Sequence, residues 1–314
     1  MIDSPITRIN HLLDWLNTRI VGQEDLTKRL VMALLCNGHL LVEGAPGLAK
    51  TRAIKELAKA IEGDFHRVQF TPDLLPSDVT GTEIYRPETG SFEFQKGPIF
   101  HNLLLADEVN RAPAKVQSAL LEGMAEHQVT VGRQTYSLPD LFLVMATQNP
   151  IEQEGTYPLP EAQLDRFLMH VEVHYPPAHQ EHKILKLARQ EVMGHDEFPP
   201  FQLTQAEIFD ARIELAELHM AEPVQKYIID LVMYTRTEMS EVEFGASPRA
   251  SIALDLTSRA EAWLNGRDFV TPDDVQKTIH DVLRHRLILT MEAEARSTEM
   301  NQLIDQVLNS VVVI

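Results

Sequence analysis

The sequence predicts an α/β protein in which a parallel sheet surrounds a phosphate-binding loop and an all-helical domain follows. Three observations predict this fold. The apolar run at 40–43 leads through a glycine-bearing turn into an apolar-periodic helix, in the order strand, loop, helix. Two further apolar runs, which begin at 103 and 141, end in polar residues, as buried parallel strands do. After residue 177, apolar residues recur at helical spacing to the end of the chain.

The first strand leads into a candidate phosphate-binding loop. Backbone amides in such a turn at a helix start point at phosphate groups, a lysine adds positive charge on the β and γ phosphates, and a hydroxyl can hold Mg²⁺. Ala49 stands where the general pattern has its second glycine, and its methyl group is tolerable if the residue has helical dihedral angles. A chance turn is the alternative. The expected nucleotide-binding residues are Gly44, Ala45, Pro46, Gly47, Leu48, Ala49, Lys50 and Thr51.

The other two strands end in residues suited to phosphoryl transfer. We expect Asp107 to coordinate Mg²⁺ together with Thr51, and Glu108 to polarise the attacking water, because these two tasks require different carboxylates. Asn149 is placed to hydrogen-bond both the water and the γ-phosphate. The alternatives are solvated acids at a strand end and turn chemistry before Pro150. Because the acids occur together with Lys50, we favour a catalytic site.

Taken together, the motifs resemble those of AAA+ ATPases, specifically the MoxR family, over nearly the whole chain. The matching segments are 20–24, 44–51, 107–113, 146–150, 164–167 and 246–250. Residues 20–24 are similar to the family's entry to the adenine pocket, which implies that Val21 and Gly22 contact the nucleotide. Ala49 matches the family's usual residue at its position. The resemblance implies ATP as the nucleotide, with Mg²⁺.

Two arginines outside the loop need separate explanations. Arg166 could form a surface ion pair of little energetic value, but the resemblance implies an arginine finger that reaches the γ-phosphate of a neighbouring subunit. Arg249 follows a predicted helix cap at Ser247 and Pro248. A cation there opposes the helix dipole, so an external anion such as a phosphate is expected. Whether Arg249 acts on its own subunit's nucleotide or a neighbour's is left open by the sequence.

Two β-hairpins are predicted as insertions in the nucleotide-binding core. The first pairs 83–86 with 91–95 around a glycine-bearing turn, and the second pairs 128–131 with 134–136. They resemble the helix-2 insert of MoxR proteins and the hairpin that precedes sensor 1. In rings of this clade such hairpins tend to face the pore and touch the client. Simple extensions at a sheet edge are the alternative.

Composition narrows the class of protein. The chain has 314 residues, of which 28 are basic and 46 acidic, so its net charge is −18 and a nucleic-acid backbone would be repelled. A single cysteine, Cys36, excludes an internal disulfide and is expected in the core. No apolar run is long enough to span a bilayer, so we expect a cytoplasmic protein without membrane insertion. Zinc binding is disfavoured for the four histidines of the middle region, His170, His174, His179 and His182.

The domain boundary is expected at residues 175–177, where the last predicted strand, 168–173, gives way to helical periodicity. This divides the chain into a nucleotide-binding α/β domain at 1–177 and a helical lid at 178–314. The expected lid helices span 208–218, 223–237, 248–264 and 271–289. The apolar residues 311–314 are expected to pack on the lid or on a neighbouring subunit.

The sequence therefore favours an ATP-hydrolysing, ring-forming AAA+ protein of MoxR type that remodels or matures a protein client. The resemblance implies a hexamer and a von Willebrand factor A-domain partner that acts with it in cofactor or metal insertion or in complex assembly. Three alternatives remain: a magnesium chelatase motor subunit, a helicase-like DNA motor and a nucleotide-binding scaffold without turnover. The negative charge disfavours the helicase, and the presence of Glu108, Asn149 and Arg166 disfavours the scaffold.

Overall fold

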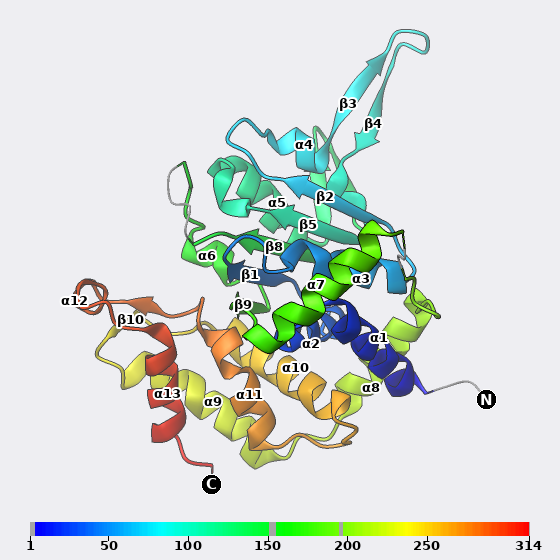
Figure 1. Ribbon diagram of the computed structural model, residues 1–314. Helices are drawn as coiled ribbons and strands as arrows, with labels where there is room; N and C mark the ends of the chain where they lie inside the picture. The colour runs from blue at the N-terminus through cyan, green and yellow to red at the C-terminus, as the bar shows by residue number, and fades with distance from the viewer. Residues whose placement is uncertain (1–3, 151–154, 195–196, 314) are drawn as a thin grey trace.

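The computed structural model describes residues 4–150, 155–194 and 197–313 and contains a five-stranded, all-parallel sheet at its centre (Figure 1). Each functional run identified in the sequence occupies an inner strand, where both faces are covered and an apolar run is stable. The predicted parallel sheet is thus confirmed. The strand order is β2 (Phe65–Gln69), β5 (Leu103–Asp107), β8 (Leu143–Gln148), β1 (Leu40–Gly44) and β9 (Met169–Val173).

Two apolar clusters cover the two faces of this sheet. Along β1, Leu40 and Val42 belong to the larger cluster, whereas Leu41 belongs to the smaller one, because successive side chains of a strand point to opposite faces. Residues of α1 (Pro5–Arg19), α2 (Glu24–Leu35) and α3 (Lys50–Ala60) enter the larger cluster, together with residues of the C-terminal helices. The smaller cluster draws on α5 (Ala114–Glu126) and Val79 of the short α4 (Pro76–Thr80).

Both predicted hairpins are confirmed as antiparallel pairs. The first consists of β3 (Gly81–Arg86) and β4 (Ser91–Lys96), and it projects from the body at the end opposite the C-terminal helices (Figure 1). The second consists of β6 (Gln128–Val131) and β7 (Gln134–Ser137). The Phe94 ring of the first hairpin stacks on the Tyr136 ring of the second, with ring centroids 4.1 Å apart. The hairpins are therefore in direct contact with each other.

The short connecting helices are η1 (Pro98–Phe100), η2 (Val109–Arg111) and α6 (Glu161–Leu164). The region after β9 is largely helical, as predicted, and Thr204 and Glu207 form a capping box at the start of α8 (Gln205–Glu217). Its helices are α7 (Ala178–Val192), α8 (Gln205–Glu217), α9 (Glu222–Thr237), α10 (Pro248–Leu264), α11 (Pro272–Leu283), α12 (Met291–Ala295) and α13 (Met300–Ser310).

One lid helix is shorter than predicted. The helix expected over 271–289 ends at Leu283, and β11 (Ile288–Leu289) pairs with β10 (Val242–Phe244) instead. The chain leaves the helix where His285 and Arg286 turn toward carbonyl groups next to β9, which a continuing helix would not allow. None of the described helices is long and apolar enough to cross a membrane.

The C-terminal tail matches its expectation only in part. Val311 packs against the larger apolar cluster, but the side chain of Val312 is 71% exposed and Val313 is also exposed. Ile314, the last residue of the predicted apolar tail, lies outside the described residues.

Buried and half-buried cations join the C-terminal helices to the core. Arg286 donates to the carbonyls of Phe167 at 2.6 Å and Leu168 at 3.2 Å, and its Nε lies 2.8 Å from Oδ1 of Asp165. Burial lowers the pKa of Arg286 to about 10, although the Asp165 carboxylate opposes this shift. Farther along the interface, Arg29 of α2 pairs with Asp281 of α11 at 2.6 Å.

Replacement of Arg286 by methionine should destabilise the protein by about 3–5 kcal/mol, because it leaves buried carbonyls and a carboxylate without their partner. The measurement is urea unfolding. Arg296 provides a matched control, because it is exposed and pairs with Glu292, one turn away. Arg296→Met should change the unfolding free energy by less than about 0.5 kcal/mol. Equal effects of the two variants would contradict this role of Arg286.

Candidate functional site

The carboxyl ends of β1, β5 and β8 meet around one cavity of about 340 Å³. Crevices at this edge of an open parallel sheet are the usual location of ligand sites in α/β folds. Most of the residues expected to bind and hydrolyse a nucleotide line this cavity. They are Pro46, Gly47, Leu48, Ala49, Lys50, Thr51, Asp107, Glu108 and Asn149, and they are joined by Arg52 and Thr147.

The loop closes directly onto the first turn of α3. The Ala49 carbonyl accepts a 2.9 Å hydrogen bond from the amide of Ala53. Ala49 itself has φ 58° and ψ 12°, so it is left-handed, and the condition of ordinary helical dihedral angles, under which its methyl group would be tolerable, is not met. A side chain in this region costs about 1–2 kcal/mol, and the loop holds the residue there nonetheless. Gly47, with φ +84°, makes the other left-handed turn of the loop without that cost.

Lys50 bridges two of the three strand ends. Its Nζ donates to the carbonyl of Gly44 at the end of β1 and to that of Gln148 at the end of β8, the latter at 3.1 Å. Burial lowers the pKa of Lys50, whereas the charges of Asp107, Glu108 and Glu43 act in the opposite direction. A half-buried ammonium group at the start of a helix is well suited to a phosphate group.

Asp107 is buried at the end of β5 and is held on both carboxylate oxygens. Thr147 Oγ1 donates to Oδ1 at 2.6 Å, and Arg67 Nη2 donates to Oδ2 at 2.7 Å. Arg67 was not identified from the sequence; only the pairing of β2 with β5 reveals it. A carboxylate and the Thr51 hydroxyl in one cavity form the hard oxygen donor set that Mg²⁺ prefers. The residues therefore fit this ion, which would compete with Arg67 for Oδ2.

Glu108 occupies a strained position directly after β5. Its φ of 56° and ψ of 51° are left-handed, a conformation that non-glycine residues often adopt at functional sites. Gln69 Nε2 donates to its carboxylate at 2.9 Å, and Arg111 Nε lies 3.0 Å from the same oxygen. Its backbone amide donates to Thr147 Oγ1 at 2.9 Å. Gln69 was not identified from the sequence, because its contact depends on the pairing of β2 with β5. Arg111 belongs to the matching segment 107–113 and lies three residues after Glu108.

Four residues expected to bind the nucleotide do not line this cavity. Gly44 and Ala45 lie at the base of the loop, where the Gly44 carbonyl accepts from Lys50 and Ala45 is buried. Val21 and Gly22 lie in the α1–α2 connection instead. Gly22 has φ +82°, and a Cβ there would come within 2.7 Å of Pro176 Cβ, next to the start of α7.

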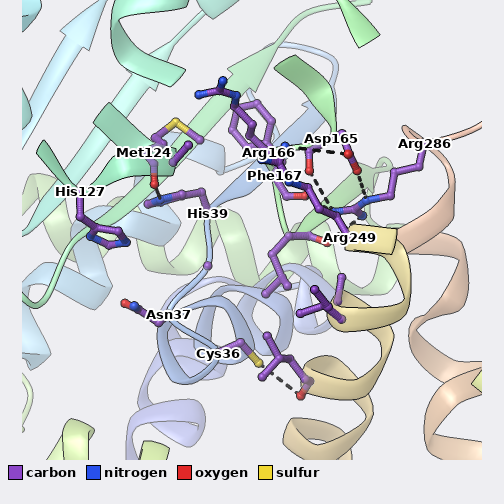
Figure 2. A pocket seen from close by; sticks show the side chains of 16 residues that line it. Cys36, Asn37, His39, Met124, His127, Asp165, Arg166, Phe167, Arg249 and Arg286 are labelled. Carbon is purple, nitrogen blue, oxygen red and sulfur yellow. Dashed lines mark hydrogen bonds and ion pairs between the residues drawn. The ribbon is translucent and has the colours of Figure 1, made fainter. Parts of the chain in front are cut away.

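Arg166 and Arg249 line a second cavity of about 380 Å³, between the core and the C-terminal helices (Figure 2). It shares no lining residue with the first cavity. Arg166 Nη1 donates to the carbonyl of Leu121 at 2.7 Å, and Arg249 Nη1 lies 3.9 Å from Asp165 Oδ2. Ser247, the expected helix cap, accepts from the Arg249 amide at 3.1 Å. Both arginines thus line a cavity other than that of their own phosphate loop.

Two other residues considered in the sequence, Cys36 and His170, make structural contacts. Cys36 is buried, its thiol donates to the carbonyl of Leu256, and burial raises its pKa to about 12, so it is a poor nucleophile. His170 Nε2 lies 3.0 Å from Glu43 Oε2, and this contact lowers the pKa of Glu43. Within the described part of the chain, no group of three or more His, Cys, Asp or Glu side chains is arranged to hold a metal ion.

Comparisons with known proteins agree with this geometry. Residues 39–169 match the family model described as the ATPase family associated with various cellular activities (AAA), and residues 235–307 match an AAA lid domain. Chaperone MoxR1 of Mycobacterium tuberculosis is 46% identical over 93% of this chain and 78% of its own length. Protein MoxR of Paracoccus denitrificans is 31% identical over 90% of this chain and 88% of its own.

Two further similarities bear on the fold and on the alternatives. The crystal structure of a candidate ATPase from Cytophaga hutchinsonii has a TM-score of 0.90 and 45% identity, and it covers 99% of this chain and 96% of its own. The magnesium-chelatase subunit ChlI of a Nostoc species is more distant, at 25% identity over 86% of this chain and 83% of its own. On the combined evidence of fold, site and relatives, the chain belongs to the MoxR family of AAA+ ATPases.

Proposed function

We propose that this ATPase is a ring-forming chaperone that uses ATP hydrolysis between neighbouring subunits to remodel or mature a protein client. One observation carries the proposal. The residues suited to binding ATP line one cavity, and the two arginines suited to completing the reaction line another. A second copy of the chain can bring the two half-sites together, and in a ring every half-site finds its complement.

Within one subunit, the loop amides and Lys50 would hold the β and γ phosphates. Thr51 and Asp107 would hold Mg²⁺, which neutralises charge on the phosphates when bound. Glu108 would accept a hydrogen bond from the attacking water and align it, after its carboxylate leaves Gln69 or Arg111. Asn149, at the end of β8, would contact the γ-phosphate. Val21 and Gly22 would contact the adenine end of the nucleotide.

Arg166 and Arg249 would act on the nucleotide of the neighbouring copy. Arg166 supplies positive charge where the transition state of phosphoryl transfer is most negative, a contribution of about 10³–10⁵ in rate. The placement of Arg249 beside Asp165, in the same cavity as Arg166, favours action in trans for both residues.

The chaperone assignment draws on the name of the Mycobacterium tuberculosis relative. We propose a hexamer, a division of the chain into an α/β domain at 1–177 and a lid at 178–314, and a von Willebrand factor A-domain protein as the partner. The client would contact the exposed aromatic pair of the projecting hairpin, Tyr85 and Phe92.

The match to a magnesium-chelatase subunit favours a chelatase-like motor as the second candidate function.

Glu108→Gln should retain ATP and Mg²⁺ but lose hydrolysis by about 10²–10⁴-fold, because only water activation is removed. Lys50→Ala should weaken nucleotide binding itself, since it removes the cation from the loop. Binding of a fluorescent ATP analogue and phosphate release, measured on the same preparations, separate the two effects. Normal turnover by Glu108→Gln would refute the assigned role.

Mixing inactive Lys50→Ala and Arg166→Ala proteins should restore part of the ATPase activity. Random assembly pairs an intact loop with an intact arginine in about one interface in four. Each protein alone, at the same total concentration, is the control. A mixture no more active than its components would argue that Arg166 serves its own subunit.

The double variant Tyr85→Ser and Phe92→Ser should lose client remodelling and keep basal ATPase activity. Both side chains are exposed and lie outside the nucleotide cavity, so the change removes apolar contact area for a client alone. Both activities are assayed together, with duplex DNA as a further test ligand. Unchanged client activation would place the contact elsewhere, and stimulation by DNA that weakens steeply with salt would support a helicase-like motor.

A further inference from the structure

Gln117 lies near the start of α5 and is fully buried. Its neighbours on the same helix, Val116, Leu120 and Leu121, belong to the smaller apolar cluster. Burial of a side-chain amide in such surroundings costs free energy unless hydrogen bonds replace those lost to water. The sequence pattern did not single out this residue, because its partners become known only from the fold.

The side-chain amide of Gln117 donates to three backbone carbonyls. Nε2 lies 3.1 Å from the oxygen of Ala112, 3.0 Å from that of Tyr157 and 3.3 Å from that of Val109. These acceptors fix the orientation of the amide, because only its nitrogen can donate. Oε1 is buried and has no hydrogen-bond partner among the described residues. An apolar side chain would avoid that cost but would leave the three carbonyls without their donor.

Two of these carbonyls lie in the turn that follows Glu108. Val109 begins η2 directly after Glu108, and Ala112 follows the last residue of η2. The left-handed dihedral angles of Glu108 cost free energy and persist only where the surroundings hold them. The Arg111 amide closes the same turn on the Glu108 carbonyl at 2.9 Å. Gln117 therefore clamps the turn that sets the direction of the Glu108 side chain.

The third carbonyl belongs to the chain that follows β8. Tyr157 comes after Asn149, the residue of this chain segment that lines the nucleotide cavity. The Tyr157 amide donates to the carbonyl of Asn110 in η2 at 2.6 Å, and its carbonyl accepts from Gln117. One side chain thus joins the turn after Glu108 to the segment that follows Asn149.

We propose that Gln117 is a positioning residue for ATP hydrolysis, which acts by holding the turn after Glu108 against the segment around Tyr157. The proposal rests on the proposed function, because it takes the Glu108 carboxylate to align the attacking water. Gln117 lines neither of the two cavities, so it acts through another residue. Its loss should therefore lower the rate of the chemical step and leave nucleotide binding nearly unchanged.

A purely structural role is the alternative, because any buried hydrogen-bonded amide contributes to stability. The two roles differ in what a variant loses. Loss of a structural residue lowers the folded fraction, whereas loss of a positioning residue lowers the turnover number of molecules that are folded and assembled. Stability, assembly and nucleotide binding are therefore measured on the same samples as turnover.

The first test compares Gln117→Met with Thr278→Val. Methionine is similar to glutamine in length but cannot donate, so the variant loses the clamp and keeps an apolar filling. Its turnover number should fall by about tenfold or more, with affinity for a fluorescent ATP analogue within about twofold. Thr278 on α11 is the matched control, because it is also fully buried, donates to backbone carbonyls and lies outside both cavities. Its variant should keep the turnover number within about twofold.

Unchanged turnover of Gln117→Met would overturn the proposal, as would an equal loss of turnover in Thr278→Val. If Gln117→Met does not fold, Gln117→Glu replaces it, because glutamate keeps the shape of the side chain and removes both N–H donors. Even when protonated, its carboxyl group offers one donor to three carbonyls. Turnover should therefore fall with nucleotide affinity retained, and unchanged turnover would again overturn the proposal.

The second test is a double-mutant cycle with Glu108→Gln, measured as single-turnover hydrolysis with whichever Gln117 variant folds. If Gln117 acts through Glu108, its variant should slow hydrolysis about tenfold in the unmodified protein and less than about twofold in the Glu108→Gln background. Equal fold-losses in both backgrounds would overturn the proposal and leave the role of Glu108 intact. Normal turnover of Glu108→Gln alone would instead refute the proposed function, and the positioning role with it.

Discussion

The hydroxyl of Thr147 fixes the arrangement on which the rest of the site depends. It donates to Asp107 at 2.6 Å and accepts from the amide of Glu108 at 2.9 Å, so the end of β8 holds both acids that follow β5. Lys50 ties the end of β8 to that of β1 through the carbonyls of Gln148 and Gly44. Three strand ends are thus held in register around one cavity, which gives the site its preorganised geometry.

The separation of the two cavities is the second constraint. Asp165 contacts Arg286, Ser247 and Arg249, so the segment that carries Arg166 is joined to the C-terminal helices more than to its own phosphate loop. Under the proposed function, one chain therefore presents two different half-sites, and hydrolysis requires a second copy.

Local patterns in the sequence were sufficient for much of this structure. The strands at 40–44 and 103–107, both hairpins and the Thr204 cap follow from periodicity and turn chemistry within a few residues. The parts of the site that the sequence did not predict depend on contacts between residues that are distant in sequence. Arg67 and Gln69 meet the acids only because β2 pairs with β5, and the left-handed Ala49 is imposed by loop closure rather than by its own preference. The early end of α11 likewise follows from tertiary contacts of His285 and Arg286.

In the proposed function, hydrolysis takes place between copies of the chain. The most direct measurement is ATPase activity per subunit as a function of protein concentration, with the sedimentation coefficient recorded on the same samples. Activity per subunit should rise in step with assembly and approach zero where the protein is monomeric. Constant activity per subunit down to concentrations at which only monomer is present would contradict it.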